Sequence, residues 1–300
     1  MHIRYYWAKL MNTTAPSNWR QNLFQQPVFL PVAVFFIALL MRLVAIDRYI
    51  TPDELIWVYR SVNFRQALGS GDWAGTLLAG HPGVITMWLG ALSTSIQLLI
   101  NPADREVYQW ITQLAWLTPD NMTALQQLSV FLTAGRVAVA VVNSLGLVII
   151  FWLARHLFGD LFAILAIGFL LLDSFLSGLS GILHVDGLAT TFATISLLFL
   201  ALALSADTGQ RGRRGSLLHT ALAGATAALA FLAKSPTLLL APVTAILFLT
   251  ILWRRRQQPI TLRLGEMVRL GVIWLVSFVA VCFLLFPALW ASPMQVLQLT

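Results

Sequence analysis

The residues best suited to chemistry begin with a Thr-Pro-Asp-Glu segment at Thr51. Threonine at the N-cap, proline at the first helical position and glutamate three residues after the cap form a capping box, which predicts the start of a helix. Capping explains Glu54 well, whereas Asp53 gains only about 0.3–1 kcal/mol from the helix dipole. Asp53, Trp57 and Arg60 follow at the spacing of one helix face, which places a carboxylate, an aromatic ring and a cation together. We therefore predict that Asp53 is a catalytic carboxylate and Arg60 a substrate contact, with Glu54 as the second catalytic candidate.

Two carboxylates and a histidine form another constellation further along the chain, at Asp173, His184 and Asp186. Asp173 stands about 13 residues into an apolar run, where an ionisable group is costly and should face a polar cavity or a partner. Asp186 is a second candidate catalytic acid, although it would also serve as the N-cap of the helix that follows, with His184 exposed beside it. Asp173 and His184 are predicted substrate contacts.

Three further cations are candidate contacts for an anionic substrate. His81 precedes a proline, so it is held extended in a tight turn from which it could donate to a phosphate; an ordinary surface histidine is the alternative. Arg42 and Arg136 interrupt apolar runs, and Arg136 is a candidate substrate contact unless both merely reach toward the membrane surface. Lys234 lies in a turn between two apolar segments.

The composition requires a membrane to position these residues. The chain of 300 residues is 58% hydrophobic and 10% charged, against about 45–50% and 25% in soluble domains. It therefore lacks the polar surface of a soluble globule, and it is not a disordered chain, a coiled coil or a disulfide-stapled module. The net charge of +7 does not indicate nucleic acid, because its distribution follows the membrane pattern described next.

Eight apolar runs are candidate membrane segments, and the charges decide how they are arranged. Cytoplasmic loops prefer basic residues, and 12 of the 19 Lys and Arg residues lie in four segments that should therefore face the cytoplasm. The acidic segments on both sides of residues 83–100 look external, so this polar run is predicted to lie on the outer face rather than to cross. The apolar runs are about 28–46, 83–100, 129–153, 161–181, 187–206, 217–233, 235–253 and 269–289.

The predicted fold is an all-α polytopic membrane protein with about seven transmembrane helices and an interfacial juxtamembrane helix in a large first extracytoplasmic loop. Residues 1–27 are predicted to be a cytoplasmic basic tail. Residues 28–300 should form a single membrane domain, with the outer loop at 47–128. The chain ends without a closing turn, and we expect the natural polypeptide to continue.

Several short motifs, taken together, resemble a known family of membrane enzymes. In order and spacing they are similar to the GT-C integral-membrane glycosyltransferases, in the branch of the protein O-mannosyltransferases and the aminoarabinose-to-lipid-A transferases. The resemblance covers about residues 30–300. It implies a polyprenyl-phosphate-linked sugar donor, a site on the outer face of the plasma (inner) membrane, Asp53 as catalytic carboxylate and Asp186 as second acid. The motifs are Pro52-Asp53-Glu54, the His81-Pro82 turn, Asp173 with Ser180 and His184-Val185-Asp186, Ala233-Lys234-Ser235-Pro236, and Phe286-Pro287-Ala288-Leu289-Trp290.

The chemistry of such a donor fits these residue types. A lipid phosphate leaves as an anion without protonation, so the reaction requires a carboxylate to accept the acceptor's proton and cations to hold the phosphate. The acceptor is a lipid, glycan or protein hydroxyl. No His, Cys, Asp or Glu cluster has metal-ligand spacing, and a divalent ion bridging Asp53 and the phosphate stays open. The rival hypothesis is a transporter or lipid-sugar flippase that uses the intramembrane acids as a polar path.

Overall fold

The computed structural model describes residues 28–44, 46–79, 82–115, 117–118, 120–205, 210–254, 256–257 and 259–299. The regular elements in this part of the chain are all helices, and it has no strand. His81, predicted to contact substrate, and the predicted basic tail at residues 1–27 lie outside it.

Eight apolar helices match the eight apolar runs of the sequence. Four are long and apolar enough to cross a bilayer, judged by length and composition. They are α8 (Leu132–Phe158), α11 (Val185–Ser205), α12 (Gln210–Ala233, apolar from Arg214) and α14 (Ile260–Leu285). The shorter ones are α3 (Phe29–Leu43), α5 (Val84–Ile100), α9 (Asp160–Leu172) and α13 (Leu240–Arg254), which follows the 3-10 turn η3 (Ser235–Leu239).

The sequence had suggested one helix over the run at 161–181, but the structure has two. Helix α9 ends at Leu172, and a short helix α10 (Ser174–Leu179) follows. The break lies at Asp173, whose extended backbone and side chain make it the N-cap of α10. A polar side chain that hydrogen-bonds the next free N–H groups offers the backbone an alternative to continued helix.

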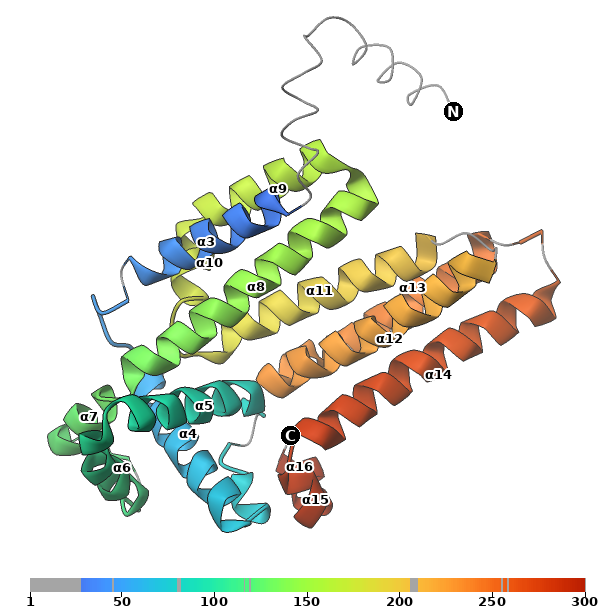
Figure 1. The fold of residues 1–300 in the computed structure, drawn as a ribbon. Helices are drawn as coiled ribbons and strands as arrows, with labels where there is room; N and C mark the ends of the chain where they lie inside the picture. The colour runs from blue at the N-terminus through green and yellow to red at the C-terminus, as the bar shows by residue number, and fades with distance from the viewer. Residues whose placement is uncertain are drawn as a thin grey trace, which may run out of the picture.

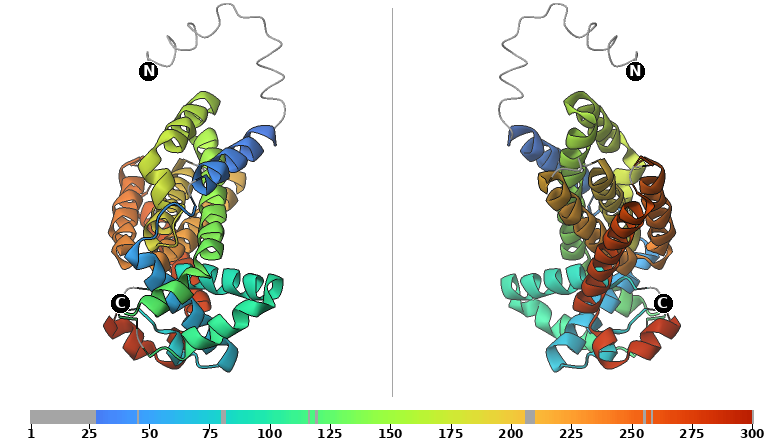
Figure 2. Two further views of the ribbon diagram at one scale, coloured as in Figure 1. Left: turned by 90° about the vertical axis from the view of Figure 1, so that its left-hand side faces the viewer. Right: turned by 90° about the vertical axis from the view of Figure 1, so that its right-hand side faces the viewer.

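The long helices form a bundle whose outer surface is apolar. Figures 1 and 2 show α8, α11, α12 and α14 running side by side in similar directions. Helix α14 has 26 residues, of which Leu270, Trp274 and Cys282 are buried. Large apolar side chains such as Val276 and Leu284 are exposed along it. An apolar surface of this extent is typical of contact with lipid.

Close approach of helix backbones stabilises the bundle. Helix α12 packs against both α11 and α14. A Cβ on Gly224 of α12 would lie 2.2 Å from the carbonyl oxygen of Trp274 on α14, so only glycine fits there. Small residues at such crossings allow the van der Waals contact that drives helix association in lipid.

A second group of helices gathers at one end of this bundle, at the bottom of Figure 2. It contains α4 (Pro52–Ser70), α5, α6 (Arg105–Thr112) and α7 (Met122–Ser129), with the 3-10 turns η1 (Ala74–Thr76) and η2 (Pro102–Asp104). The short C-terminal helices α15 (Ala288–Ala291) and α16 (Pro293–Leu299) lie at the same end.

Helix α5 lies across the end of the bundle, and two hydrogen bonds hold it there (Figure 2). The Trp88 indole N–H donates to the carbonyl of Leu285, at the end of α14, over 2.8 Å. The Gln97 amide donates to the carbonyl of Val130, just before α8, over 2.9 Å. Helix α5 therefore connects the ends of two long helices, and the segment between α3 and α8 packs as a layer over this end of the bundle.

Several basic residues lie at the opposite end of the long helices. Arg155 is in the last turn of α8, Arg214 is near the start of α12, and Arg254 ends α13. Figure 1 shows these three helix ends together, away from α4 and α5. The molecule thus has one basic end and one end that carries the predicted site.

Candidate functional site

The capping box at the start of α4 is confirmed. Glu54 Oε2 accepts hydrogen bonds from the backbone N–H of Thr51 over 3.1 Å and from its hydroxyl over 3.0 Å. Pro52 occupies the first helical position, and Gly71 ends the helix with a φ of 74°. The local signal alone therefore determined where α4 begins.

Glu54 also has long-range partners, which the sequence did not reveal. Arg136 of α8 donates to both of its oxygens, from Nε over 2.7 Å and from Nη2 over 2.6 Å. The backbone N–H of Leu183 donates to Oε1 over 3.0 Å. The side chains of Glu54 and Arg136 are 0% and 3% exposed. A bidentate, fully buried pair of this kind fixes the relative position of the segments that carry it.

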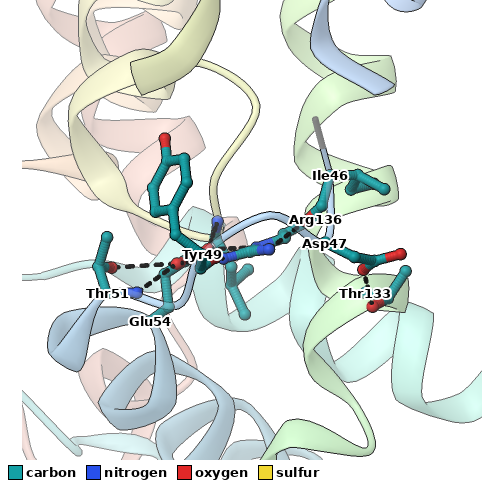
Figure 3. Close-up of polar contacts among 8 residues, drawn as sticks. Ile46, Asp47, Tyr49, Thr51, Glu54, Thr133 and Arg136 are labelled. Atoms are coloured by element: carbon teal, nitrogen blue, oxygen red, sulfur yellow. Dashed lines mark hydrogen bonds and ion pairs between the residues drawn. The ribbon is translucent and has the colours of Figure 1, made fainter. Parts of the chain in front are cut away.

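Most donors of Arg136 are already used by the protein. Besides Glu54, its guanidinium donates to the carbonyls of Ile46 and Tyr49 in the segment that leads into α4 (Figure 3). In the same segment, Asp47 accepts from the Thr133 hydroxyl over 2.8 Å. The sequence predicted Arg136 as a substrate contact or a side chain that reaches the membrane surface, but the structure gives it the contacts of an internal anchor.

The charge of Glu54 is well matched by its surroundings. Burial alone would raise the pKa of its carboxyl, but hydrogen bonds from Arg136, Thr51 and Leu183 and the Arg136 charge together lower the pKa below the ordinary value of 4.5. Glu54 is therefore ionised at neutral pH, with its lone pairs occupied. These contacts suit a structural carboxylate better than a base.

Asp53, the adjacent residue, points the other way into a polar setting. Its side chain is 69% exposed, and its Oδ2 lies 3.6 Å from Nε2 of His184. Nδ1 of His184 accepts the backbone N–H of Asp186 at 3.4 Å. A neutral histidine that accepts at Nδ1 carries its proton on Nε2, the nitrogen that faces Asp53. Asp53 thus has a donor on one side and open space on the other.

Asp186 and Lys234 continue this arrangement into a row of four polar side chains. Asp186 Oδ2 lies 3.6 Å from His184 Nδ1, and its Oδ1 pairs with the ammonium of Lys234. Lys234 follows the last residue of α12, and Asp186 lies in the first turn of α11. We call Asp53, His184, Asp186 and Lys234 the polar row. The structure brings these four predicted residues together from α4, the start of α11 and the end of α12.

The side chains of Trp57 and Arg60 on α4 lie beside the polar row. The Trp57 ring meets His184 edge to face at 6.5 Å between centroids, and the Arg60 guanidinium lies 4.7 Å above the Trp57 ring. Burial lowers the pKa of Arg60, while the Asp53 charge opposes this shift. Gly83, with a φ of 55°, packs so closely that a Cβ there would lie 2.1 Å from Trp57. Gly83, in the turn that follows His81, therefore packs against Trp57.

Asp173 has a different set of contacts. Its exposed carboxylate accepts from the backbone N–H groups of Phe175 over 2.9 Å and Leu176 over 3.0 Å, as the cap of α10. We expected Asp173 to face a polar cavity or a partner. In the structure its partners are the first backbone N–H groups of α10. Asp173 and Arg136 stand outside the polar row.

Asn143 is a positioning residue that the sequence reading missed. Its buried amide on α8 donates to the carbonyl of Ser180 over 2.9 Å and accepts from the Thr191 hydroxyl of α11 over 2.7 Å. These bonds hold the segment that leads to His184 between two long helices. A lone asparagine within an apolar run is costly in a membrane, and that cost was the available signal.

A groove of about 810 Å³ lies on another part of the outer layer, along the C-terminal half of α4. Arg65, Trp88, Ser95 and Tyr108 are among its lining residues. None of its described lining residues is an acid, so the candidate carboxylates lie in the polar row instead. Among the residues that the structure describes, no three His, Cys, Asp or Glu side chains come together as a metal site.

Fold and site together define a multi-pass helical membrane protein with an acid, histidine and lysine site at one end. Comparison with protein families gives this class a name: the profile described as "Dolichyl-phosphate-mannose-protein mannosyltransferase" matches residues 120–289. The match covers more than half of the chain, which therefore belongs to this family, a family of GT-C glycosyltransferases. The resemblance read from the motifs is confirmed. No curated protein and no solved structure matched the chain.

Proposed function

We propose that this protein transfers a sugar from a polyprenyl-phosphate-linked donor to a hydroxyl group of a lipid, glycan or protein on the extracytoplasmic side of the plasma membrane. The family supports a membrane glycosyltransferase, and its name makes mannose the first sugar to test. The observation that carries the proposal is the different environment of the adjacent carboxylates Asp53 and Glu54. Asp53 is exposed beside His184, whereas Glu54 is buried in an ion pair.

The proposed reaction is a single displacement. The acceptor oxygen attacks C1 of the sugar while its proton passes to Asp53, and the bond between C1 and the phosphate oxygen breaks with its electron pair. The lipid phosphate leaves as an anion and requires no general acid. Attack from the face opposite the leaving group inverts the anomeric centre. Asp53 is suited to this step because its carboxylate combines exposure with a fixed neighbour.

The other members of the polar row orient the base and hold the anion. The Nε2 proton of His184 would hold one oxygen of Asp53 and leave the second oxygen for the acceptor. Lys234, fixed by Asp186, is proposed to bind the donor phosphate. Arg60 and His81 are proposed as further phosphate contacts, because Arg60 and the turn after His81 both lie against Trp57. Charge-assisted hydrogen bonds to a phosphate are the strongest contacts such side chains make.

The proposed topology has seven crossings. In addition to the four long helices, α3, the α9–α10 pair and the η3–α13 segment would cross the membrane. Helix α5 would lie in the outer interface, as its course across the bundle suggests (Figure 2). The basic end of the bundle then faces the cytoplasm, in keeping with the preference of Lys and Arg for cytoplasmic loops. The polar row faces outward.

The transporter or flippase hypothesis is not favoured. Family membership supports transfer chemistry. In addition, Asp173, one of the acids assigned to a polar path, caps α10 with its carboxylate.

The test is sugar transfer by the full-length protein in membranes or lipid nanodiscs, with a radiolabelled polyprenyl-phosphate mannose. Asp53→Asn should abolish transfer and leave donor binding intact, because asparagine keeps the size of the side chain but cannot accept the proton. Asp120→Asn, an exposed acid of the same outer loop, is the matched control and should transfer normally. Near wild-type turnover by Asp53→Asn would assign the base to another residue and contradict the mechanism.

A further inference from the structure

Arg42 is a buried cation that the proposed reaction does not use. It lies in the last turn of α3 and is 5% exposed. Its Nη1 donates to the carbonyl of Ala38 over 2.8 Å, one turn back on the same helix. Its Nε is buried and has no hydrogen-bond partner. An arginine stays protonated in proteins, so this site holds a positive charge away from water.

No acid neutralises this charge within the part of the chain that the structure describes: the ion pairs there leave Arg42 without a carboxylate. Its neighbour Arg136 does not help, since that cation already pairs with Glu54. Buried charges in proteins are almost always paired or bound to an ion, because an isolated one is costly. The positive charge of Arg42 is therefore not balanced by a negative charge among the described residues.

A small cavity is lined in part by Arg42. Its volume is about 50 Å³, and its lining includes Arg42, Arg136, Tyr49, Ser177 and Gly181. A water molecule takes about 30 Å³ of liquid volume, so this space suits one ligand of about that size. Two arginines line the cavity and only one of them is paired with an acid, so the net charge around it is positive.

We propose that the Arg42 cavity binds an anionic atom, which is either a free halide ion or one oxygen of a lipid phosphate. The ligand completes the hydrogen bonding of Arg42 and neutralises its charge. It also joins α3, α8 and the α10 segment, whose residues line the cavity. An anion is therefore part of the folded state at this point, independently of the sugar-transfer site.

The experiment measures thermal unfolding of the full-length protein in nanodiscs made of zwitterionic lipid. Chloride, bromide and gluconate are compared at equal ionic strength, so that screening is constant and gluconate is too large for the cavity. A ligand at ten times its Kd lowers the unfolding equilibrium constant about 11-fold. We expect a saturable rise of the unfolding midpoint with chloride and bromide for the wild type. Arg42→Met, which keeps the apolar stem and removes the charge, should lose this response.

A second arm identifies the source of the anion. Polyprenyl phosphate without sugar is added in gluconate buffer. If a lipid phosphate is the ligand, this compound stabilises the wild type more than Arg42→Met, and halides have no effect. Arg48→Met, which removes an exposed arginine a few residues further on, is the control and should respond like the wild type.

Two results would overturn the proposal. One is a wild type whose unfolding responds to neither halide nor lipid phosphate, which would mean that water fills the cavity. The other is an equal response in Arg42→Met, which would place the anion elsewhere. If Arg42→Met does not fold, Arg42→Lys serves as the second variant and should respond more weakly than the wild type, whereas an unchanged response would place the anion elsewhere. None of these readouts depends on sugar transfer.

Discussion

Replacement of Glu54 by glutamine should destabilise the protein far more than replacement of its neighbour Asp53. In the folded state Glu54 accepts five hydrogen bonds, three at Oε2 and two at Oε1. A glutamine amide keeps one acceptor oxygen, but its NH2 group replaces the other oxygen and faces the N–H or O–H donors that this oxygen accepted from. It also leaves Arg136 buried without a counter-charge. Removal of one partner from a buried ion pair costs about 3–5 kcal/mol, and we expect a loss of this size in the free energy of unfolding.

The assay is equilibrium unfolding of the full-length protein in nanodiscs or mild detergent. Asp53→Asn is the matched control: it makes the same chemical change one residue away on an exposed carboxylate, and the loss should stay below about 1 kcal/mol. The double variant Glu54→Gln with Arg136→Met should lose less than the sum of the single losses, by about 1–3 kcal/mol. A Glu54→Gln protein within 1 kcal/mol of wild type would refute the reasoning.

The same pair predicts how stability depends on pH. The folded-state pKa of Glu54 is lowered below the ordinary value of 4.5. The stabilisation from this carboxylate is therefore complete above the ordinary pKa and is lost as the pH falls through the lowered value. The stability difference between wild type and Glu54→Gln should be constant near neutral pH and shrink below about pH 4.5. A difference that persists unchanged to pH 3 would contradict this.

Three further predictions concern the site and the topology. Gly83→Ala should destabilise the protein and reduce transfer, because its Cβ would collide with Trp57. Gly69→Ala, where a Cβ has open space, is the control and should leave unfolding and transfer near wild type. Equal effects of the two variants would disprove the close packing. Lys234→Ala should raise the apparent donor constant about 10- to 150-fold, as expected for one charge-assisted bond; an effect on the acceptor constant alone would assign Lys234 to the other substrate. Cysteines introduced at the exposed positions Ala74 and Asp120 should both react with an impermeant thiol reagent from outside, and protection of either would refute the seven-crossing scheme.

The parts of the site that followed from the sequence rest on local signals. The capping box fixed the start of α4 to the residue, because the cap and its acceptor are three positions apart. The apolar runs fixed where the bundle helices lie, because burial in lipid needs a continuous apolar surface. Asp186 and Lys234, which the sequence singled out separately as a candidate acid and a candidate cation, form an ion pair in the structure.

The parts that escaped prediction depend on partners far apart in the chain. Glu54 had a sufficient local explanation as a capping residue, so nothing in the sequence demanded a second partner. Arg136 lies 82 positions away, and an arginine near the end of an apolar run is usually explained by its reach to the surface. The capping role of Asp173 was missed for the opposite reason. Its depth in an apolar run suggested a polar cavity or a partner, and the structure shows that its carboxylate caps the adjacent helix.

The separation of Glu54 from its partners also sets an order of assembly during synthesis. The Thr51 cap is complete as soon as the first turn of α4 forms, so the helix itself can begin early. Leu183, which donates to the same carboxylate, is made 129 residues later. At about 5–20 residues per second this interval lasts about 6–26 s. Throughout it the segment that carries α4 has a formed helix end that is not yet docked, and the polar row is complete only when Lys234, after the end of α12, has also been made.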